Sequence, residues 1–201
     1  MSEIGKSIDQ AVNSGLAERL KQLGYRKNAR TFYVRDIEYT KIVQVRASSF
    51  NLPRTGHFEV MLGVYFPDVA RLLEKPSLKR LPRYEACIIW SSLGRLAFDA
   101  TRRKEDIWYE IDLNLPTDLQ ALARKIDDEW QKYGHLWINR VTDPEKAAQE
   151  LSHYGLYIMA AAIYLAKGLR EKASEQILLD MAKRPGVESW AKKWAERHGL
   201  I

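Results

Sequence analysis

A ten-residue segment with a strict two-residue period constrains the fold more than any other part of this sequence. The segment runs from His57 to Phe66. Its apolar series is Phe58, Val60, Leu62, Val64 and Phe66, and its intervening series includes Glu59, Met61, Gly63 and Tyr65. Successive side chains of a strand point to opposite faces of the sheet, so one of these two series should lie in a core. We therefore predict a strand with one fully apolar face.

Four other segments have the β-branched and aromatic composition of strands. They are Arg30–Arg35, Glu38–Ser48, Glu85–Ser91 and Asp106–Leu113. One short helix, Asp68–Glu74, is the only helix predicted among them. Strands that follow one another through short links pair as an antiparallel meander. The pattern predicts a curved, mainly antiparallel sheet of about five strands in an α+β fold.

Helical periodicity precedes and follows the strands. Ser7 and Gln10 have the spacing of a capping box, which predicts a single helix that begins at Ser7 and ends at Gly24. Its apolar stripe is Ile8, Val12, Leu16, Leu20 and Leu23. Thr117 with Gln120 is a second capping box, and either Thr142 or Asp143 caps the next helix.

The sequence becomes alanine-rich after Tyr154, and three further helices are expected to end at His198. We therefore divide the chain into an α+β domain of residues 1–142, whose sheet is backed by helices, and an all-helical tail of residues 143–201. The indoles of Trp190 and Trp194 are expected to pack against the preceding helical hairpin rather than against a partner, because two exposed indoles would form a sticky patch.

Several classes of protein are disfavoured by the sequence. A single cysteine, Cys87, excludes an internal disulfide and fits a reducing compartment, so we expect a cytoplasmic protein. The longest nearly apolar run, Leu156–Ala166, has eleven residues, whereas a membrane helix needs about 20. We therefore expect no membrane partner. The first residues, which include Glu3, lack the apolar centre of a secretory signal.

Catalytic and cofactor motifs are missing from the sequence. Its four histidines do not form an H-x-x-x-H pair, and it contains no phosphate-binding glycine loop and no G-x-S-x-G motif. Cys87 lies in an apolar run, so we expect a buried thiol with a raised pKa and low reactivity. The acids Asp127, Asp128 and Glu129 are interpreted as solvated charges on a helix. We expect no enzyme activity, no metal and no cofactor.

The face of the sheet opposite the apolar one carries the candidate binding residues. They are Gln44, Arg46, Ser48, Arg54, His57, Glu59 and Tyr65. An antiparallel sheet covered by helices on one face leaves the other face open. There Arg46 could bind a carboxylate or phosphate through two parallel hydrogen bonds. The simpler alternative is a face wetted by solvent or covered by the C-terminal helices.

Several short motifs follow one another in an order known from another group of proteins. The leucine-glycine-aromatic step Leu23–Tyr25 precedes the aromatic segment Thr31–Tyr33 and the strand Phe58–Phe66. Cys87 and the Trp108–Tyr109 pair come later. Over roughly residues 16 to 150, this series resembles a bacterial family catalogued as a domain of unknown function, numbered 4304. The resemblance implies an α+β fold and no known activity.

The chain departs from that family at two places. Arg46 and Ala47 stand where the family has glutamine and lysine, and Tyr109 stands where it has a second tryptophan. If the strand around Arg46 holds a ligand site in the family, its chemistry is changed in this chain.

The tail resembles one tetratricopeptide repeat. Ala161 lies three residues before Tyr164, and Ala173, Ile177 and Pro185 lie nine, thirteen and twenty-one residues after it. These are the spacings of the small, aromatic and proline positions in that helical hairpin of roughly 34 residues. A capping hairpin packed on the main domain is the alternative.

The leading functional hypothesis is a non-enzymatic binding protein that recognises a protein partner, with an immunity or toxin-neutralising role by analogy with other small bacterial proteins. The second hypothesis is nucleic-acid binding through the basic segment 19–35. Its cations are Arg19, Lys21, Arg26, Lys27, Arg30 and Arg35. The third hypothesis is an enzyme with an unrecognised pocket on the open sheet face.

Overall fold

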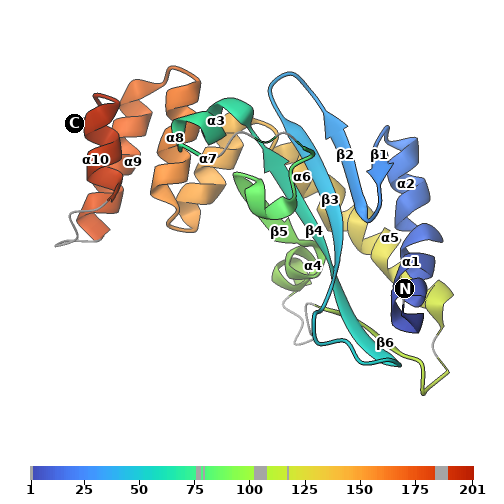
Figure 1. Cartoon of the computed structure of the whole chain (residues 1–201). Coiled ribbons are helices and arrows are strands. Elements are labelled where there is room, and N and C mark those ends of the chain that lie inside the picture. Colours follow the sequence, from blue (N-terminus) through green and yellow to red (C-terminus); the bar gives the residue numbers. More distant parts are fainter. Residues whose placement is uncertain (1, 76–77, 79, 102–107, 117, 184–189) are drawn as a thin grey trace.

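The fold is α+β, as predicted: an antiparallel sheet with helices, followed by further helices (Figure 1). The computed structural model describes residues 2–75, 78, 80–101, 108–116, 118–183 and 190–201. Among these, no helix has the length and apolar character needed to cross a membrane.

Six strands within the described residues form one antiparallel sheet. They are β1 Arg26–Asn28, β2 Thr31–Arg35, β3 Thr40–Ala47, β4 Thr55–Tyr65, β5 Ile89–Ser92 and β6 Tyr109–Asp112. The first five lie in sequence order, but β6 pairs with β4 rather than with β5. Thr55–Phe58 of β4 pairs with β6, and Met61–Val64 pairs with β5. The expected simple meander is therefore wrong at its last strand, because the long β4 carries two short partners on the same side.

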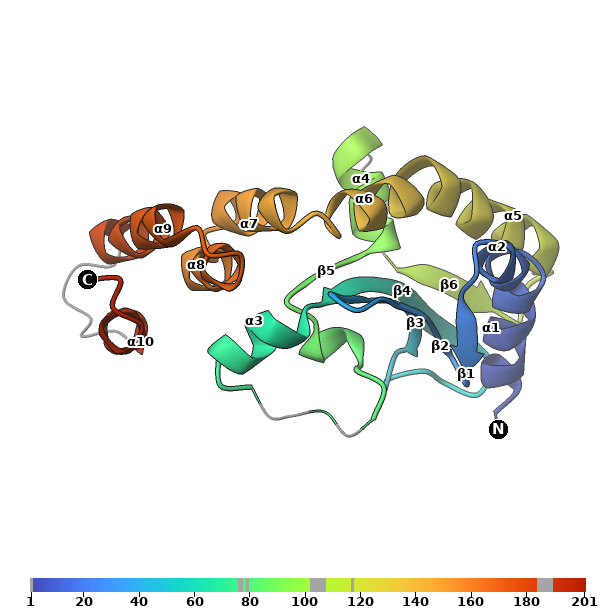
Figure 2. The ribbon, with the colours of Figure 1, turned by 90° about the horizontal axis from the view of Figure 1, so that it is seen from above.

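The apolar face of β4 lies in the core as its two-residue period predicts. Phe58, Val60, Leu62 and Val64 are all fully buried. Three helices contact β4: α1 Glu3–Asn13, α4 Leu93–Thr101 and α6 His135–Arg140. Two others, α2 Leu16–Gln22 and α5 Leu119–Glu129, pack on α1 and contribute to the same core. Figure 2 shows α5 and α6 on one side of the sheet and α3, Pro67–Leu72, on the other.

The N-terminal helix begins earlier than predicted and is divided in two. Ser2, rather than Ser7, caps α1 by accepting a hydrogen bond from the Gly5 backbone N–H at 3.1 Å. The division falls at Gly15, where an added Cβ would lie 2.8 Å from the Ala123 carbonyl oxygen of α5. The close approach to α5 therefore requires glycine at this corner. Gly24 ends α2 at φ +80°, as predicted.

The segment between α3 and α4 is the least well predicted part of the fold. Glu85–Ser91 was expected to be a strand, but only its end belongs to β5. The 3-10 turn η1, Tyr84–Ala86, precedes β5, and Cys87 follows that turn in an extended backbone. Strand β1 and helix α4 were not predicted. Strand β1 has three exposed residues and therefore no alternation of burial.

The helices after β6 begin at aspartate caps. Asp118 accepts hydrogen bonds from the backbone N–H groups of Gln120 and Ala121, both at 2.9 Å, while the predicted cap Thr117 lies outside the described residues. Asp143, one of the two predicted alternatives, caps α7, Pro144–His153. Between α5 and α6 the helix widens into the π-helical turn η2, Trp130–Gly134.

The tail consists of α7 followed by α8 Tyr157–Ala166, α9 Arg170–Lys183 and α10 Trp190–Arg197, and it extends away from the sheet (Figure 2). The indole of Trp194 is buried, and its Nε1–H donates to the Leu72 carbonyl oxygen of α3 at 2.8 Å. The indole of Trp190 is 51% exposed, so the predicted packing of both indoles is correct only for Trp194.

Candidate functional site

The second face of the sheet is covered at its centre, contrary to the expected open surface. Ile42, Glu59 and Met61 point to this face and are 0%, 7% and 2% exposed. Residues 80–88, here called the covering segment, supply Tyr84 and Cys87 over this region. A Cβ at Gly63 would lie 2.7 Å from the Cys87 sulfur, so the glycine in β4 makes room for the thiol.

Three of the seven predicted binding residues meet beneath the covering segment. The Arg46 Nη1–H donates to the Tyr84 hydroxyl at 2.5 Å, and Arg46 Nε lies 3.9 Å from Glu59 Oε2. Gln44 Oε1 accepts from the Tyr84 backbone N–H at 3.2 Å. The hydrogen bond to Tyr84 is the largest cause that raises the pKa of Arg46. Gln44 and Arg46 therefore bind the chain's own covering segment.

The other four predicted residues lie elsewhere. Ser48 Oγ accepts from the Phe50 backbone N–H at 3.1 Å in the β3–β4 connection, and Arg54 donates to the Leu113 carbonyl oxygen at 2.6 Å. His57 is exposed in β4. Tyr65, at the opposite end of β4, lines a different cavity. The seven residues therefore do not converge on one site.

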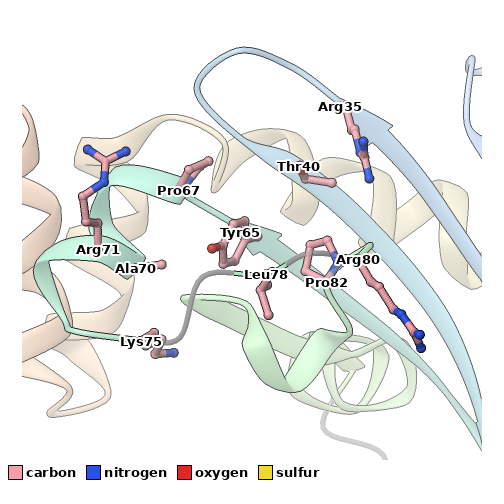
Figure 3. Close-up of a pocket in the computed structure, with 10 residues that line it drawn as sticks. All are labelled: Arg35, Thr40, Tyr65, Pro67, Ala70, Arg71, Lys75, Leu78, Arg80 and Pro82. Atoms are coloured by element: carbon pink, nitrogen blue, oxygen red, sulfur yellow. The ribbon is translucent and has the colours of Figure 1, made fainter.

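The cavity at Tyr65, here called the basic pocket, has a volume of about 390 Å³ (Figure 3). Its lining residues are Arg35, Thr40, Tyr65, Pro67, Ala70, Arg71, Lys75, Leu78, Arg80 and Pro82. They come from the ends of β2 and β4, the start of β3, helix α3 and the chain that follows it. Four of the ten are cations and none is an acid, so the pocket is electropositive.

Burial and neighbouring charges shift the pKa values of groups around the basic pocket. Burial lowers the pKa of Lys75, and the nearby Cys87 thiol partly opposes this. Burial raises the pKa of Tyr65, whereas Arg71 lowers it. Arg71 Nη2 lies 3.1 Å from Asp68 Oδ1 in an exposed ion pair that is open to competition from a ligand.

A second cavity, here called the tail groove, lies between β5 and the helices α7 and α8, and has a volume of about 600 Å³. Its lining residues are Glu59, Met61, Ile88, Ile89, Trp90, Ser91, Ser92, Arg95, Trp137, Glu150, Leu151, Tyr154, Leu156 and Met159. An adjoining cavity of about 670 Å³ shares Trp137, Glu150 and Tyr154 with it. Three large apolar side chains on the groove remain exposed: Trp90 by 53%, Tyr154 by 60% and Leu156 by 43%.

The charged groups of the tail groove have partners within the protein. Glu150 accepts a hydrogen bond from the Trp137 Nε1–H at 2.6 Å and also pairs with Arg140. Arg95 pairs with Asp99 at 2.9 Å. These contacts fix the groove walls and leave its surface largely apolar between paired charges.

Cations of the basic segment 19–35 are also bound within the fold. Arg19 donates twice to Asp127, each time at 3.3 Å. Arg30 donates to Asp9 at 2.6 Å and to the Gly5 carbonyl oxygen at 2.8 Å. These internal pairs leave fewer cations for phosphate contacts than the sequence suggested. Asp127 is correspondingly not the freely solvated acid that was expected.

Glu129 also differs from its expected solvated state. It is 8% exposed, and the Tyr109 hydroxyl donates to its Oε2 at 2.6 Å. Cys87 is buried as predicted, and burial raises the pKa of its thiol. Among the described residues, no group of three or more histidine, cysteine, aspartate or glutamate side chains has the arrangement of a metal site.

The sequence did not predict the basic pocket or the tail groove. Of the basic-pocket residues only Tyr65 was a candidate, and of the groove residues only Glu59. A usable signal was the proline-containing stretch after α3, where Lys75 and Arg80 are separated from the next acid, Glu85. The groove has no local signal, because β5 and α8 are far apart in the sequence and meet only in the fold.

Comparison with known proteins identifies the family. The family model described as "Domain of unknown function (DUF4304)" matches residues 16–140, more than half of the chain, and the chain belongs to this family. The match ends before α7, so the whole tail lies outside it. No curated protein and no solved structure matches the chain.

Proposed function

We propose that this chain is a non-enzymatic binding protein that holds a segment of a protein partner in the tail groove. The observation that carries this proposal is the convergence of exposed Trp90, Tyr154 and Leu156 on the tail groove, which adjoins a second cavity at Tyr154. A contiguous exposed apolar patch that is rimmed by polar residues is typical of a protein interaction site. Aromatic residues in such a groove are the side chains that contribute most to binding energy.

The edge of β5 gives the partner segment a defined conformation. Among the described strands, β5 pairs only with β4, and five consecutive residues, Ile88–Ser92, line the groove. An edge strand offers backbone N–H and C=O groups to an added chain, while side-chain pockets beside it supply specificity. We infer that the partner inserts an extended segment next to β5.

The remaining functional hypotheses have less support from the contacts of the described residues. The groove's Glu150 and Arg95 are held by internal partners, so a free acid–base pair for catalysis is not at hand there. The nucleic-acid hypothesis is weakened by the internal pairing of Arg19 and Arg30. An immunity or toxin-neutralising role in the cytoplasm remains the specific form of partner binding that we propose. The single buried Cys87 supports a reducing compartment.

The helical tail forms the second wall of the proposed binding site. Ala161, Tyr164, Ala173 and Ile177 are buried where α8 packs on α9, which supports a tetratricopeptide-like hairpin. Pro185, the remaining position of that pattern, lies outside the described residues. In this proposal the connection between α7 and α8 presents Tyr154 and Leu156 to the groove, and α9 packs on α8.

Site-specific photo-crosslinking tests the proposal. A photoreactive phenylalanine replaces Trp90 in one variant and Ile37, which is 97% exposed in the β2–β3 turn, in the control variant. Both are illuminated in a nuclease-treated extract of the source cells. We expect one protein to be crosslinked at position 90 and not at position 37, with the modified residues in a single extended segment of that protein.

A substitution in the same groove provides the second readout. Adding Tyr154→Ala to the position-90 variant should reduce crosslinking by about tenfold or more, since a central aromatic contact contributes roughly 2 kcal/mol. Adding Ile37→Ala should leave the yield unchanged. Equal crosslinking at positions 90 and 37, or a yield indifferent to Tyr154→Ala, would contradict the proposal.

A further inference from the structure

The basic pocket is separate from the tail groove and has a different chemistry. Figure 3 shows Arg71 and Lys75 on one side of Tyr65, and Arg35 and Arg80 on the other. The four cations come from the end of β2, from α3 and from the chain after it, so the fold, rather than one basic run, brings them around this cavity.

Three of these cations have no carboxylate partner among the described residues. Arg71 pairs with Asp68, but Arg35, Lys75 and Arg80 form no ion pair within the described part of the chain. This contrasts with Arg19, Arg30, Arg95 and Arg140, each of which pairs with an internal acid. Like charges around one cavity repel one another, so a bound anion would relieve this repulsion.

The donors around the pocket fit a phosphate group better than a carboxylate. Arginine presents parallel N–H groups to two oxygens, and lysine acts as a compact positive charge. The Tyr65 and Thr40 hydroxyls add neutral donors at the wall. A phosphomonoester carries a charge of about −1.5 to −2 and three acceptor oxygens, whereas a carboxylate has one charge and two oxygens. The phosphate therefore offers more charge and one more acceptor oxygen to the cations that line the pocket.

We propose that the basic pocket binds the phosphomonoester group of a small ligand, held by Arg35, Arg71, Lys75 and Arg80 around Tyr65. The volume of about 390 Å³ lies at the small end of ligand pockets, which span roughly 300 to 1,000 Å³. The ligand is therefore a small phosphorylated molecule rather than a dinucleotide. This site shares no lining residue with the tail groove, so it stands or falls independently of the proposed partner binding.

Calorimetric titration with glycerol phosphate tests the assignment through its dependence on pH. The second pKa of a phosphomonoester is about 6, so its dianion rises from roughly a tenth of the total at about pH 5 to nearly all of it at about pH 7.5. We expect binding to be about tenfold tighter at the higher pH. Sulfate, which stays doubly charged over this range, should bind with little change.

The titration of the pocket's own groups would not produce tighter binding at the higher pH. Among the described residues, those facing it are Tyr65 from β4, Lys75 and the neighbouring Cys87 thiol, beside the guanidinium groups of Arg35, Arg71 and Arg80 and the Asp68 carboxylate that pairs with Arg71. Burial lowers the pKa of Lys75, so its loss of a proton would weaken binding as the pH rises, the opposite of the expected trend.

Charge-removing variants locate the site. Arg71→Gln and Arg80→Gln remove exposed side chains, so folding should persist. Each should weaken glycerol phosphate binding by about tenfold, the range expected for a charged hydrogen bond. Lys75→Gln should act similarly, and Lys75→Arg should largely retain binding. The matched control Lys6→Gln removes an equal charge on α1 and should change the affinity by less than about twofold.

Several outcomes would overturn the assignment. They are the absence of saturable binding at about 10 mM glycerol phosphate, a Lys6→Gln effect as large as that of Arg71→Gln, and a pH-independent affinity. Preferential binding of dimethyl phosphate or a single-stranded oligonucleotide would also overturn it, because phosphodiesters carry one charge and would point to a nucleic-acid backbone.

Discussion

Removing the hydroxyl of Tyr109 should show how much its hydrogen bond between β6 and α5 contributes to the stability of the fold. The Tyr109 hydroxyl donates to Glu129 Oε2 at 2.6 Å, and the two residues are 4% and 8% exposed. The ring of Tyr109 also packs on Phe58, with centroids 5.3 Å apart. Tyr109→Phe keeps this ring contact and leaves no large cavity. It removes only the donor that solvates a buried carboxylate.

The loss should lie near the value for a hydrogen bond to a charged group. That value is about 1.5 to 3 kcal/mol. For a chain of this size each kcal/mol lowers the melting temperature by about 2 to 4 °C, so the expected fall is roughly 3 to 12 °C. Tyr33→Phe is the matched control. The Tyr33 side chain is only partly buried and its hydroxyl has no hydrogen bond within the described residues, so the control should change stability by less than about 0.5 kcal/mol.

The pH dependence of this variant provides a second check. Burial raises the pKa of Tyr109 well above its ordinary value, with repulsion from Glu129 adding to the effect. An unfolded tyrosine titrates near about pH 10, so the stability contributed by neutral Tyr109 is complete below that pH. It is lost as the pH rises from there through the folded-state pKa. The difference between wild type and Tyr109→Phe should therefore shrink above about pH 10.

Urea unfolding followed by far-ultraviolet circular dichroism measures both effects. A Tyr109→Phe destabilisation no larger than that of Tyr33→Phe would refute the account of the buried hydrogen bond. A difference that stays constant from about pH 8 to pH 11 would refute the account of its ionisation.

Three further predictions concern the corner of the N-terminal helices, the docking of the tail and the buried thiol. Gly15→Ala should destabilise the fold by about 1 to 3 kcal/mol in urea unfolding, because its Cβ would lie 2.8 Å from the Ala123 carbonyl oxygen; an unchanged midpoint would contradict that close approach. Trp194→Phe removes an indole hydrogen bond to a carbonyl of α3 and should lower the free energy of unfolding by about 0.5 to 1.5 kcal/mol. Trp190→Phe should be nearly neutral, because Trp190 is largely exposed. Equal effects of the two substitutions in thermal unfolding would argue against the docking of α10 on α3. The Cys87 thiol should react with an aromatic disulfide reagent far more slowly in the native protein than in urea, because it is buried and its pKa is raised; similar rates would contradict its burial.

The sheet was predictable wherever one face is buried and the strand is long. In β4 the alternation from Phe58 to Val64 is a local property of the sequence, and it placed the strand to within two residues at either end. Short elements have too few residues to show a period. Strand β1 has three exposed residues. Helix α4 had one readable signal: Ser92 Oγ accepts from the Arg95 backbone N–H at 3.1 Å, in the spacing of a helix cap.

The sequence predicted which candidate residues share a face of the sheet, but not which residues of the chain contact them. The prediction that Gln44, Arg46 and Glu59 share one face is correct, because side-chain direction follows from strand register. The sequence could not show that Tyr84 lies over this face, about forty positions further along the chain. Glu129 illustrates the same limit. Its position in the sequence suggests a solvated charge, whereas the pairing of β6 with β4 brings Tyr109 to it.

The covering segment explains why the two candidate sites lie at the margins of the sheet rather than at its centre. It is fixed over the middle by the Tyr84 bonds to Gln44 and Arg46 and by the contact of Cys87 with Gly63. The polar groups predicted to bind a ligand are thereby occupied by the protein itself. The ends of the sheet remain uncovered, with cations gathered around Tyr65 and apolar side chains along β5. The covering segment lines both regions, through Arg80 in the basic pocket and Ile88 in the tail groove, and so connects the two candidate sites along the chain.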